Sequence, residues 1–230
     1  MIVSAVFYRK EENWGNTISL LPEEISHLKS LRLYQIEKKL EFRNGKGNYY
    51  TYLIPPKSNL GELISKDFRE VQDKNTIVVS ALPSSGKLEI ILEKGTELGI
   101  TEFVFTNFSR SDRKDFNIER SNKIILNSCS QCKRETIPDI KFYKNYKEII
   151  NKFTNLFYLH PYANNSLYGS SALIEGIPII GPEGGLSEEE LTFFEENKIS
   201  GYRVSKNILR IETAVLSIAN ILLFERNKDK

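Results

Sequence analysis

A glycine-rich segment marks the place where this chain could hold a ligand. Gly181-Pro182-Glu183-Gly184-Gly185 directly follows the apolar run 177–180, and three of its five residues are glycine. Glycine lets the backbone approach a ligand closely and tolerates left-handed conformations. Such a loop after a buried strand is typical of ligand binding at the carboxyl end of a parallel sheet, although some only make a tight turn. The residues alone leave both interpretations open.

The residues around this loop argue against a nucleotide ligand. The segment has neither the Gly-Lys-Ser/Thr of a P-loop nor the Gly-x-Gly-x-x-Gly of dinucleotide-binding folds. Glu183 and the acids at 188–190 would repel a polyphosphate. The same acids would tolerate the cationic sulfonium and amino groups of S-adenosylmethionine. The segment therefore favours S-adenosylmethionine over a nucleotide.

A second candidate pair, Arg210 and Glu212, stands between the run 201–204 and a strongly apolar segment. Charges beside a core helix need solvent, each other or a ligand. A surface ion pair, with Glu212 favouring the helix N-terminus, accounts for them without any catalysis. A functional pair is the alternative.

The elements that would position these residues alternate between strand and helix. Amphipathic segments separate the apolar runs, which predicts a mostly parallel sheet covered by helices, an α/β fold. The expected strands are 76–82, 102–105, 156–159, 177–180 and 201–204. Ser187 and Glu190 form a capping-box pattern, which predicts a helix from about 188 to 196. Gly99 is expected to end the helix that follows the first of these strands.

The first seventy residues show a different pattern. Short strands at 2–8, 39–43 and 49–54, a helix-like segment at 22–31 and an Asn44-Gly45 turn predict a small β-rich module. We therefore expect two domains, 1–70 and 71–230.

Composition and charge narrow the class of protein. With 40% hydrophobic and 27% charged residues the chain reads as a soluble globular protein, and no apolar run approaches a membrane span of ~20 residues. The N-terminus lacks the features of a secretory leader, so we expect a cytoplasmic protein. Cys129 and Cys132 have neither a second pair nor suitably spaced histidines, which favours reduced structural thiols and no metal.

The net charge of +2 is too small to indicate a nucleic-acid partner by itself. Between Arg110 and Arg134, however, seven Lys/Arg stand against three acids, a local excess of four positive charges. This segment could meet phosphates, or it could be a solvated helix face.

Taken in order, several motifs resemble one known family. GPEGGLSEEE at 181–190 and ILRIETA at 208–214 are similar to elements of the RsmE family of ribosomal RNA uridine-N3 methyltransferases, within the SPOUT superfamily. The segments 27–32 and 94–100 resemble the H-x-x-x-L-R and K-x-x-E-L-G-V elements of that family. Arg110-Ser111, Gln131-x-x-Arg134 and Pro138 match its central pattern. The chain departs at 204–207, where a glycine is missing and Asn207 replaces a common arginine.

The resemblance implies a fold and a set of partners. The fold would be a SPOUT-type domain with a trefoil knot and a mostly parallel sheet, preceded by a PUA-like RNA-binding domain. The family acts as a homodimer on 16S ribosomal RNA of the small subunit, with S-adenosylmethionine as the cofactor. By this likeness the cofactor-binding residues are Leu159, His160, Ile180, Gly181, Glu183, Gly184, Gly185, Val204, Ser205, Ile208 and Leu209.

The resemblance also implies roles in the chemistry. Uridine N3 must lose a proton as it attacks the methyl group, so Arg210 is the candidate for stabilising negative charge on the base. Glu212 would either accept the proton or orient Arg210, and we favour orientation because a carboxylate beside an arginine is a weak base. The candidate RNA contacts are Arg32, Arg110, Arg113 and Arg134.

Two other functions compete with this one. A SPOUT ribose 2′-O-methyltransferase would share the fold and the cofactor but would methylate a sugar hydroxyl. A ribosome-assembly factor without catalysis would use the same fold only to bind RNA.

Overall fold

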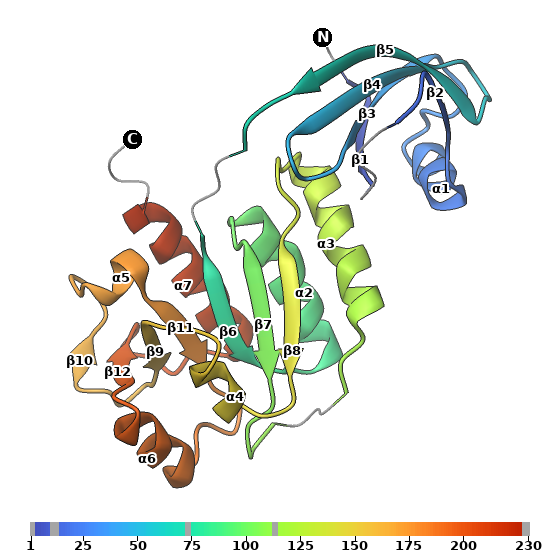
Figure 1. The fold of residues 1–230 in the computed structure, drawn as a ribbon. Coiled ribbons are helices and arrows are strands. Elements are labelled where there is room, and N and C mark those ends of the chain that lie inside the picture. Colours follow the sequence, from blue (N-terminus) through green and yellow to red (C-terminus); the bar gives the residue numbers. More distant parts are fainter. Residues whose placement is uncertain (1–2, 10–13, 72–74, 112–114, 227–230) are drawn as a thin grey trace. The chain divides into compact units, whose positions relative to one another are not determined.

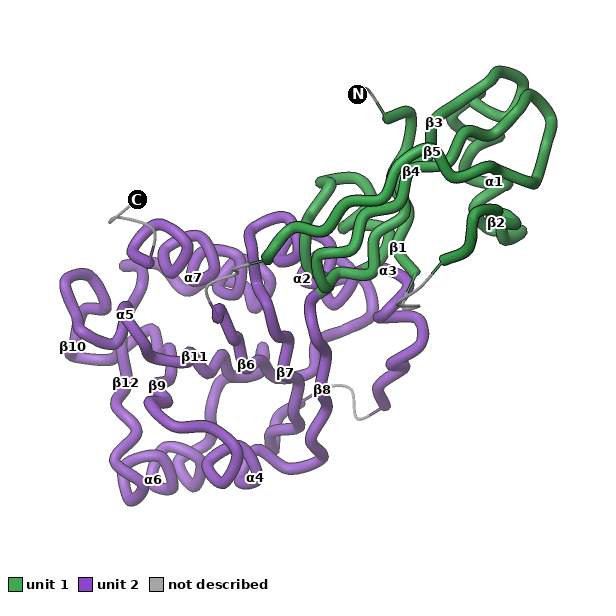
Figure 2. Tube along the Cα trace, turned by 45° about the horizontal axis from the view of Figure 1, so that its top comes forward, with its two compact units in different colours: residues 1–73, 126–137 green, residues 74–125, 138–230 purple. Residues whose placement is uncertain are grey.

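The computed structural model describes residues 3–9, 14–71, 75–111 and 115–226 (Figure 1). The chain forms two compact units (Figure 2). Unit 1 comprises residues 1–73 and 126–137, and unit 2 comprises residues 74–125 and 138–230. The sequence pattern predicts that 126–137 belongs to the second domain, whereas in the structure this segment packs with unit 1. None of the described helices is long and apolar enough to span a bilayer.

Unit 1 is built on a five-stranded sheet with the order β1-β3-β4-β5-β2. Strand β1 pairs parallel with β3, and the other pairs are antiparallel. The strands are β1 Ala5–Tyr8, β2 Thr17–Ser19, β3 Lys38–Arg43, β4 Asn48–Ile54 and β5 Leu60–Phe68, and the helix α1 is Pro22–Ser30. The expected turn joins β3 to β4: Gly45 has φ +73°, and the Asn44 side chain accepts hydrogen bonds from the backbone N–H groups of Lys46 and Asn48.

An aromatic and aliphatic core holds this sheet against α1. Phe42 stacks on Phe7 and meets the edge of Tyr52, and Leu28 of α1 and Leu40 of β3 are fully buried in the same cluster. Burial of such side chains is the main favourable contribution to folding.

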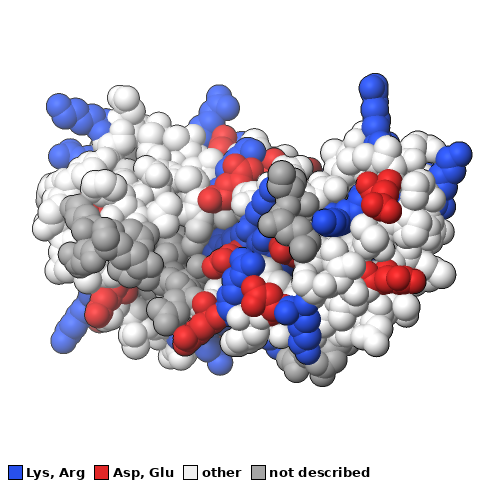
Figure 3. Space-filling view, turned by 90° about the horizontal axis from the view of Figure 1, so that it is seen from above, with Lys and Arg blue, Asp and Glu red and all other residues white. Residues whose placement is uncertain are grey.

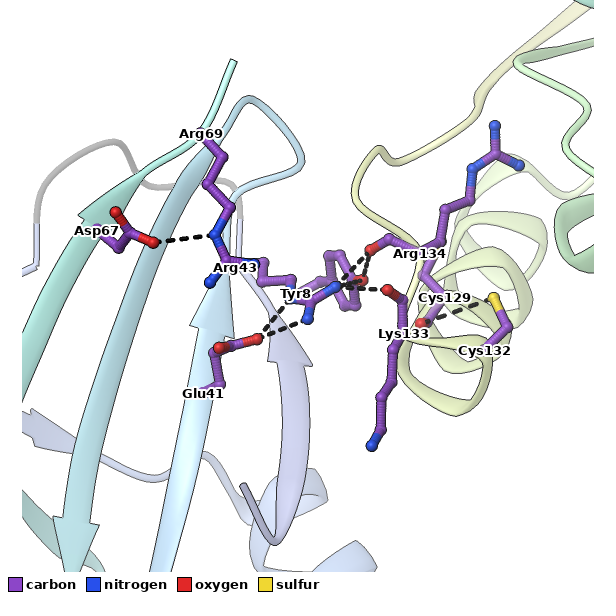
Figure 4. A network of polar contacts seen from close by, with 9 residues as sticks. All are labelled: Tyr8, Glu41, Arg43, Asp67, Arg69, Cys129, Cys132, Lys133 and Arg134. Atoms are coloured by element: carbon purple, nitrogen blue, oxygen red, sulfur yellow. Dashed lines mark hydrogen bonds and ion pairs between the residues drawn. The ribbon is translucent and has the colours of Figure 1, made fainter. Parts of the chain in front are cut away.

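The end of helix α3, Ile118–Cys132, is held by the sheet of unit 1 (Figure 4). The last carbonyl groups of a helix have no partner within the helix. Here Arg43 Nη1 donates to the carbonyl oxygens of Lys133 at 2.5 Å and Arg134 at 3.0 Å, and the Tyr8 hydroxyl also donates to that of Arg134. Arg43 is in turn paired with Glu41, its Nε lying 2.7 Å from the carboxylate. These bonds explain why 126–137 belongs to unit 1.

Unit 2 contains a seven-stranded sheet with the order β10-β12-β9-β11-β6-β7-β8, in which every pair is parallel. This confirms the mostly parallel α/β sheet that the alternating pattern predicts. The strands are β6 Ile77–Ala81, β7 Glu102–Thr106, β8 Asp139–Tyr143, β9 Leu156–Leu159, β10 Asn165–Ser166, β11 Ile177–Ile180 and β12 Ser200–Arg203.

Helices pack on this parallel sheet, and Figure 1 shows α2 and α7 side by side behind β6 and β7. The helices are α2 Ser85–Glu97, α4 Lys147–Ile150, α5 Ala172–Glu175, α6 Glu188–Glu196 and α7 Ile211–Arg226. Gly99, with φ +85°, follows the end of α2, as the sequence predicts. On the α6 side, Phe194 stacks on Tyr158 of β9 at 5.1 Å between ring centroids.

The two cysteines of α3 differ in their surroundings. Cys129 is buried and Cys132 is exposed, and both are free thiols. Burial raises the pKa of the Cys129 thiol to about 12. Since the thiolate is the reactive form, Cys129 is an inert core residue at neutral pH.

The Arg43 network yields a stability prediction. Replacing Arg43 by Met leaves the buried Glu41 carboxylate without its cation and removes the Arg43 donor from the carbonyls of Lys133 and Arg134, of which that of Arg134 keeps the Tyr8 hydroxyl. We expect a loss of about 3–5 kcal/mol in the free energy of unfolding, measured by urea denaturation.

Arg69 provides the matched control. It pairs with Asp67 on the same sheet, but its side chain is 52% exposed against 10% for Arg43. Arg69→Met is expected to change stability by less than about 1 kcal/mol. Equal losses for the two variants would contradict the role given to Arg43.

Candidate active site

A cavity of about 590 Å³ opens in unit 2 where β9, β11 and β12 end and α7 begins. Its size is that of a small-molecule site. Parallel strands bring their carboxyl ends to one edge of the sheet, so loops far apart in sequence meet there. The lining consists of residues 159–162, 180–186 and 207–211 together with Lys87, Arg110, Val204, Ser205 and Ala214.

All eleven residues that the sequence analysis assigns to the cofactor line this one cavity. They come from three strand ends: Leu159 and His160 at the end of β9, the segment 180–185 at the end of β11, and 204–209 after β12. Their contact with a cofactor stays a prediction.

The glycine-rich loop needs its glycines for steric reasons. A Cβ on Gly181 would lie 2.9 Å from the Leu186 side chain, so the loop folds back tightly on itself. Gly185 has φ +74°, a conformation that side chains disfavour, and its N–H donates to the Pro182 carbonyl at 2.9 Å. The loop is therefore a compact turn that presents its backbone to the cavity.

Glu190 anchors the segment that follows this loop. It is 1% exposed, and its carboxylate accepts hydrogen bonds at 2.7 Å from the backbone N–H groups of both Ser187 and Ser109. The Ser187 hydroxyl accepts from the Glu190 N–H at 3.3 Å, which completes the predicted capping box. One carboxylate thus joins the start of α6 to the loop after β7.

Two cationic side chains, those of Arg110 and Lys87, bind the glycine-rich loop. Arg110 Nη1 donates to the Gly184 carbonyl at 3.1 Å, so this candidate RNA contact lies in the cavity wall. Lys87, in the first turn of α2, lies 2.5 Å from the Glu183 carboxylate. Sequence reasoning missed Lys87, because no motif connects it with a residue 96 positions away.

The departure from the family pattern lies in the cavity wall. The Ser205 hydroxyl accepts from the Asn207 N–H at 3.0 Å. This side-chain turn closes the 204–207 segment without the missing glycine. Sequence reasoning also missed Asn207 as a lining residue, together with Pro161, Tyr162, Pro182, Leu186, Ile211 and Ala214.

His160 contributes no positive charge to the cavity. Burial lowers the pKa of its imidazole, and its Nδ1 accepts a hydrogen bond from the Tyr162 N–H at 3.3 Å. A neutral ring therefore lines the wall at pH 7, which suits a cationic ligand.

Arg210 and Glu212 occupy different surroundings. Arg210 is exposed and lines the cavity. Glu212 is half-buried outside the lining, and its Oε2 is buried without a hydrogen-bond partner in the described part of the chain. Arg210 therefore does not neutralise that oxygen, and neither the surface ion pair nor orientation of Arg210 by this oxygen is seen.

Comparison with known proteins identifies the family. Residues 70–223 match the profile of the RNA methyltransferase domain family. A ribosomal RNA small subunit methyltransferase E from Helicobacter pylori is 31% identical over 209 residues, which cover 86% of this chain and 91% of that protein. The chain belongs to the ribosomal RNA small subunit methyltransferase E family. The resemblance seen in the sequence motifs is thereby confirmed.

Two further proteins of this methyltransferase family are similar over nearly their whole length. The one from Mesomycoplasma hyopneumoniae is 28% identical and covers 90% of this chain and 92% of its own. The crystal structure of the one from Neisseria gonorrhoeae, bound to S-adenosylmethionine, superimposes with a TM-score of 0.83 at 22% identity, covering 96% of this chain and 97% of that chain. The methyltransferase E fold is thus shared.

The described residues among the other candidate RNA contacts of this methyltransferase, Arg32 and Arg134, do not line the cavity. Arg32 and Arg134 belong to unit 1, and Arg113 lies outside the described residues. Arg32 is exposed with φ +59° at the end of α1. On the face drawn in Figure 3, basic and acidic side chains are interspersed rather than separated into one basic patch.

Glu190 gives a prediction for the site. Glu190→Ala removes the acceptor for two backbone N–H groups and the capping box, and we expect a loss of about 3 kcal/mol in the free energy of unfolding by urea denaturation. Glu189→Ala is the control. The Glu189 side chain, next to Glu190 on α6, is 81% exposed and should contribute less than about 1 kcal/mol to the free energy of unfolding. A loss for Glu190→Ala no larger than that for Glu189→Ala would refute the bridging role.

Proposed function

We propose that this protein transfers the methyl group of S-adenosylmethionine to N3 of a uridine in 16S ribosomal RNA. The observation that carries the proposal is the cavity, because the residues assigned to the cofactor from three separate segments all line it. Family membership and the S-adenosylmethionine bound to the Neisseria gonorrhoeae relative support the same ligand.

The cavity wall fits the chemistry of S-adenosylmethionine. Leu159, Ile180 and Leu209 offer apolar surface for the adenine ring. Glu183, although paired with Lys87, places a carboxylate in the wall, and His160 adds no positive charge beside the sulfonium and amino groups. The compact loop at 181–185 presents backbone groups rather than bulky side chains.

When bound, the cofactor supplies an electrophilic methyl carbon on a sulfonium. N3 forms the new bond to this carbon, the bond from carbon to sulfur breaks, and the N3 proton leaves. Arg210, exposed in the cavity wall, would stabilise the negative charge that spreads onto O2 and O4 of the uracil. Glu212 lies outside the cavity lining with its Oε2 buried, which argues against direct contact with N3, so the N3 proton would leave to solvent water.

We further propose the architecture that the family resemblance implies. Residues 1–70 would form a PUA-like RNA-binding domain and residues 71–230 a SPOUT domain with a trefoil knot. The active form would be a cytoplasmic homodimer. The small mixed sheet of unit 1, the parallel sheet of unit 2 and the fold shared with the Neisseria gonorrhoeae relative support this arrangement. Arg32, Arg113 and Arg134 would contact the RNA.

Arg210→Ala tests the proposed chemistry. Removal of one charge-stabilising donor is expected to lower kcat about 100-fold, while the Kd for S-adenosylmethionine changes less than about threefold. The assay is transfer of labelled methyl to small ribosomal subunits that lack the modification, with calorimetry for cofactor binding.

Arg203→Ala is the matched control, because Arg203 is an exposed arginine at the end of β12 that does not line the cavity. It should retain wild-type kcat. Equal activity of Arg210→Ala and wild type would remove Arg210 from the mechanism, and no transfer by the wild-type protein would refute the proposed function.

A further inference from the structure

A second groove of about 540 Å³ lies beside the candidate active site in unit 2. It is bounded by the end of β9, by Asn164 and Asn165 at β10, by the start of β12, and by residues of α6 and the turn that follows it. His160 and Tyr162 line both the candidate active site and this groove, so the two are contiguous. Neither the sequence motifs nor the proposed mechanism uses this groove.

The floor of the groove depends on a glycine. A Cβ on Gly201 would lie 2.7 Å from the Tyr158 hydroxyl, so only glycine lets β12 pass so close to that ring. Burial and the negative charge of Glu195 raise the pKa of Tyr158. The hydroxyl therefore stays protonated and is a hydrogen-bond donor at neutral pH.

The polar groups of the groove suit a neutral ligand. Its lining carries one acid, Glu195, and one base, Lys198, and the pKa of His160 is lowered by burial, so their charges cancel. A phosphate would need an excess of positive charge. The side chains of Asn164 and Asn165 each offer both a donor and an acceptor.

The aromatic ring of Tyr162 lies at the boundary between the cofactor cavity and the groove. Tyr162 is 75% exposed, although burial of such a ring would be favourable. Unpaired bases of RNA are recognised by stacking on aromatic rings and by hydrogen bonds to their edges. The groove thus combines an exposed aromatic ring, amide groups and no net charge. These features suit a planar, neutral ligand that forms hydrogen bonds.

We propose that this groove binds an unpaired RNA base next to the methylated uridine, with the base stacked on Tyr162 and its edge read by Asn164 and Asn165. The proposal rests on the proposed function and names how the substrate is held. The target base must leave its stack to reach the cofactor cavity. A neighbouring base bound in the contiguous groove would stabilise this unstacked conformation of the RNA.

The test is filter binding of small ribosomal subunits lacking the modification, which does not require catalysis. Tyr162→Ala removes the ring on which the base would stack and should raise the Kd for subunits about tenfold. Asn164→Ala, which touches only the groove, should raise it several-fold. Tyr162→Phe keeps the ring and should bind within about twofold of wild type.

Two controls separate the groove from the cofactor cavity. Ser166→Ala changes an exposed residue of β10 outside the groove and should leave subunit binding unchanged. For Asn164→Ala, which lines the groove but not the cofactor cavity, the Kd for S-adenosylmethionine, measured by calorimetry, should stay within about threefold of wild type.

Unchanged subunit affinity of Tyr162→Ala and Asn164→Ala would overturn the proposal. So would a change from dimer to monomer in light scattering that accompanies the loss of affinity, since a second copy of the chain would then occupy the groove. If the wild-type protein transfers no methyl but the variants lose subunit binding as expected, the proposed function fails and the RNA groove stands.

Discussion

The cavity depends on a carboxylate that never enters it. Glu190 is buried at the start of α6 and accepts hydrogen bonds from the backbone of two loops, at Ser187 and at Ser109. Buried N–H groups without acceptors are costly, so these bonds determine where both loops lie. The glycine-rich loop is then positioned between fixed points, and Arg110 can reach the Gly184 carbonyl. The cavity is thus a product of backbone satisfaction at the carboxyl edge of a parallel sheet.

This arrangement separates the roles of the cations in the cavity wall. Lys87 and Arg110 are engaged by the glycine-rich loop, through Glu183 and Gly184 respectively. Arg210, by contrast, makes no side-chain hydrogen bond with another described residue, and it stands exposed where α7 begins. Structural cations and a candidate catalytic cation therefore share one wall. Glu183 is the one acid among the described residues of this lining, against Lys87, Arg110 and Arg210, so one guanidinium stays available for a developing anion.

Much of this could be predicted from sequence, because it depends on local chemistry. The capping box at Ser187 and Glu190 and the end of α2 at Gly99 follow from the properties of single residues, and the parallel sheet follows from alternating apolar runs. What sequence could not give are contacts across long stretches of chain. The bond from Glu190 to Ser109, the Lys87–Glu183 pair and the docking of α3 by Arg43 join residues about 80 to 100 positions apart. The surroundings of Glu212 were also beyond reach, since an ion pair with Arg210 is plausible from spacing alone.

The chemical identity of the product tests the proposed N3 methylation most directly. Small ribosomal subunits lacking the modification are incubated with the wild-type protein and labelled S-adenosylmethionine, and the RNA is digested to nucleosides and analysed by mass spectrometry. We expect the label to appear in 3-methyluridine. Label in a 2′-O-methylated nucleoside would contradict the assignment of the target atom, and binding of cofactor and subunits without any transfer would contradict catalysis itself.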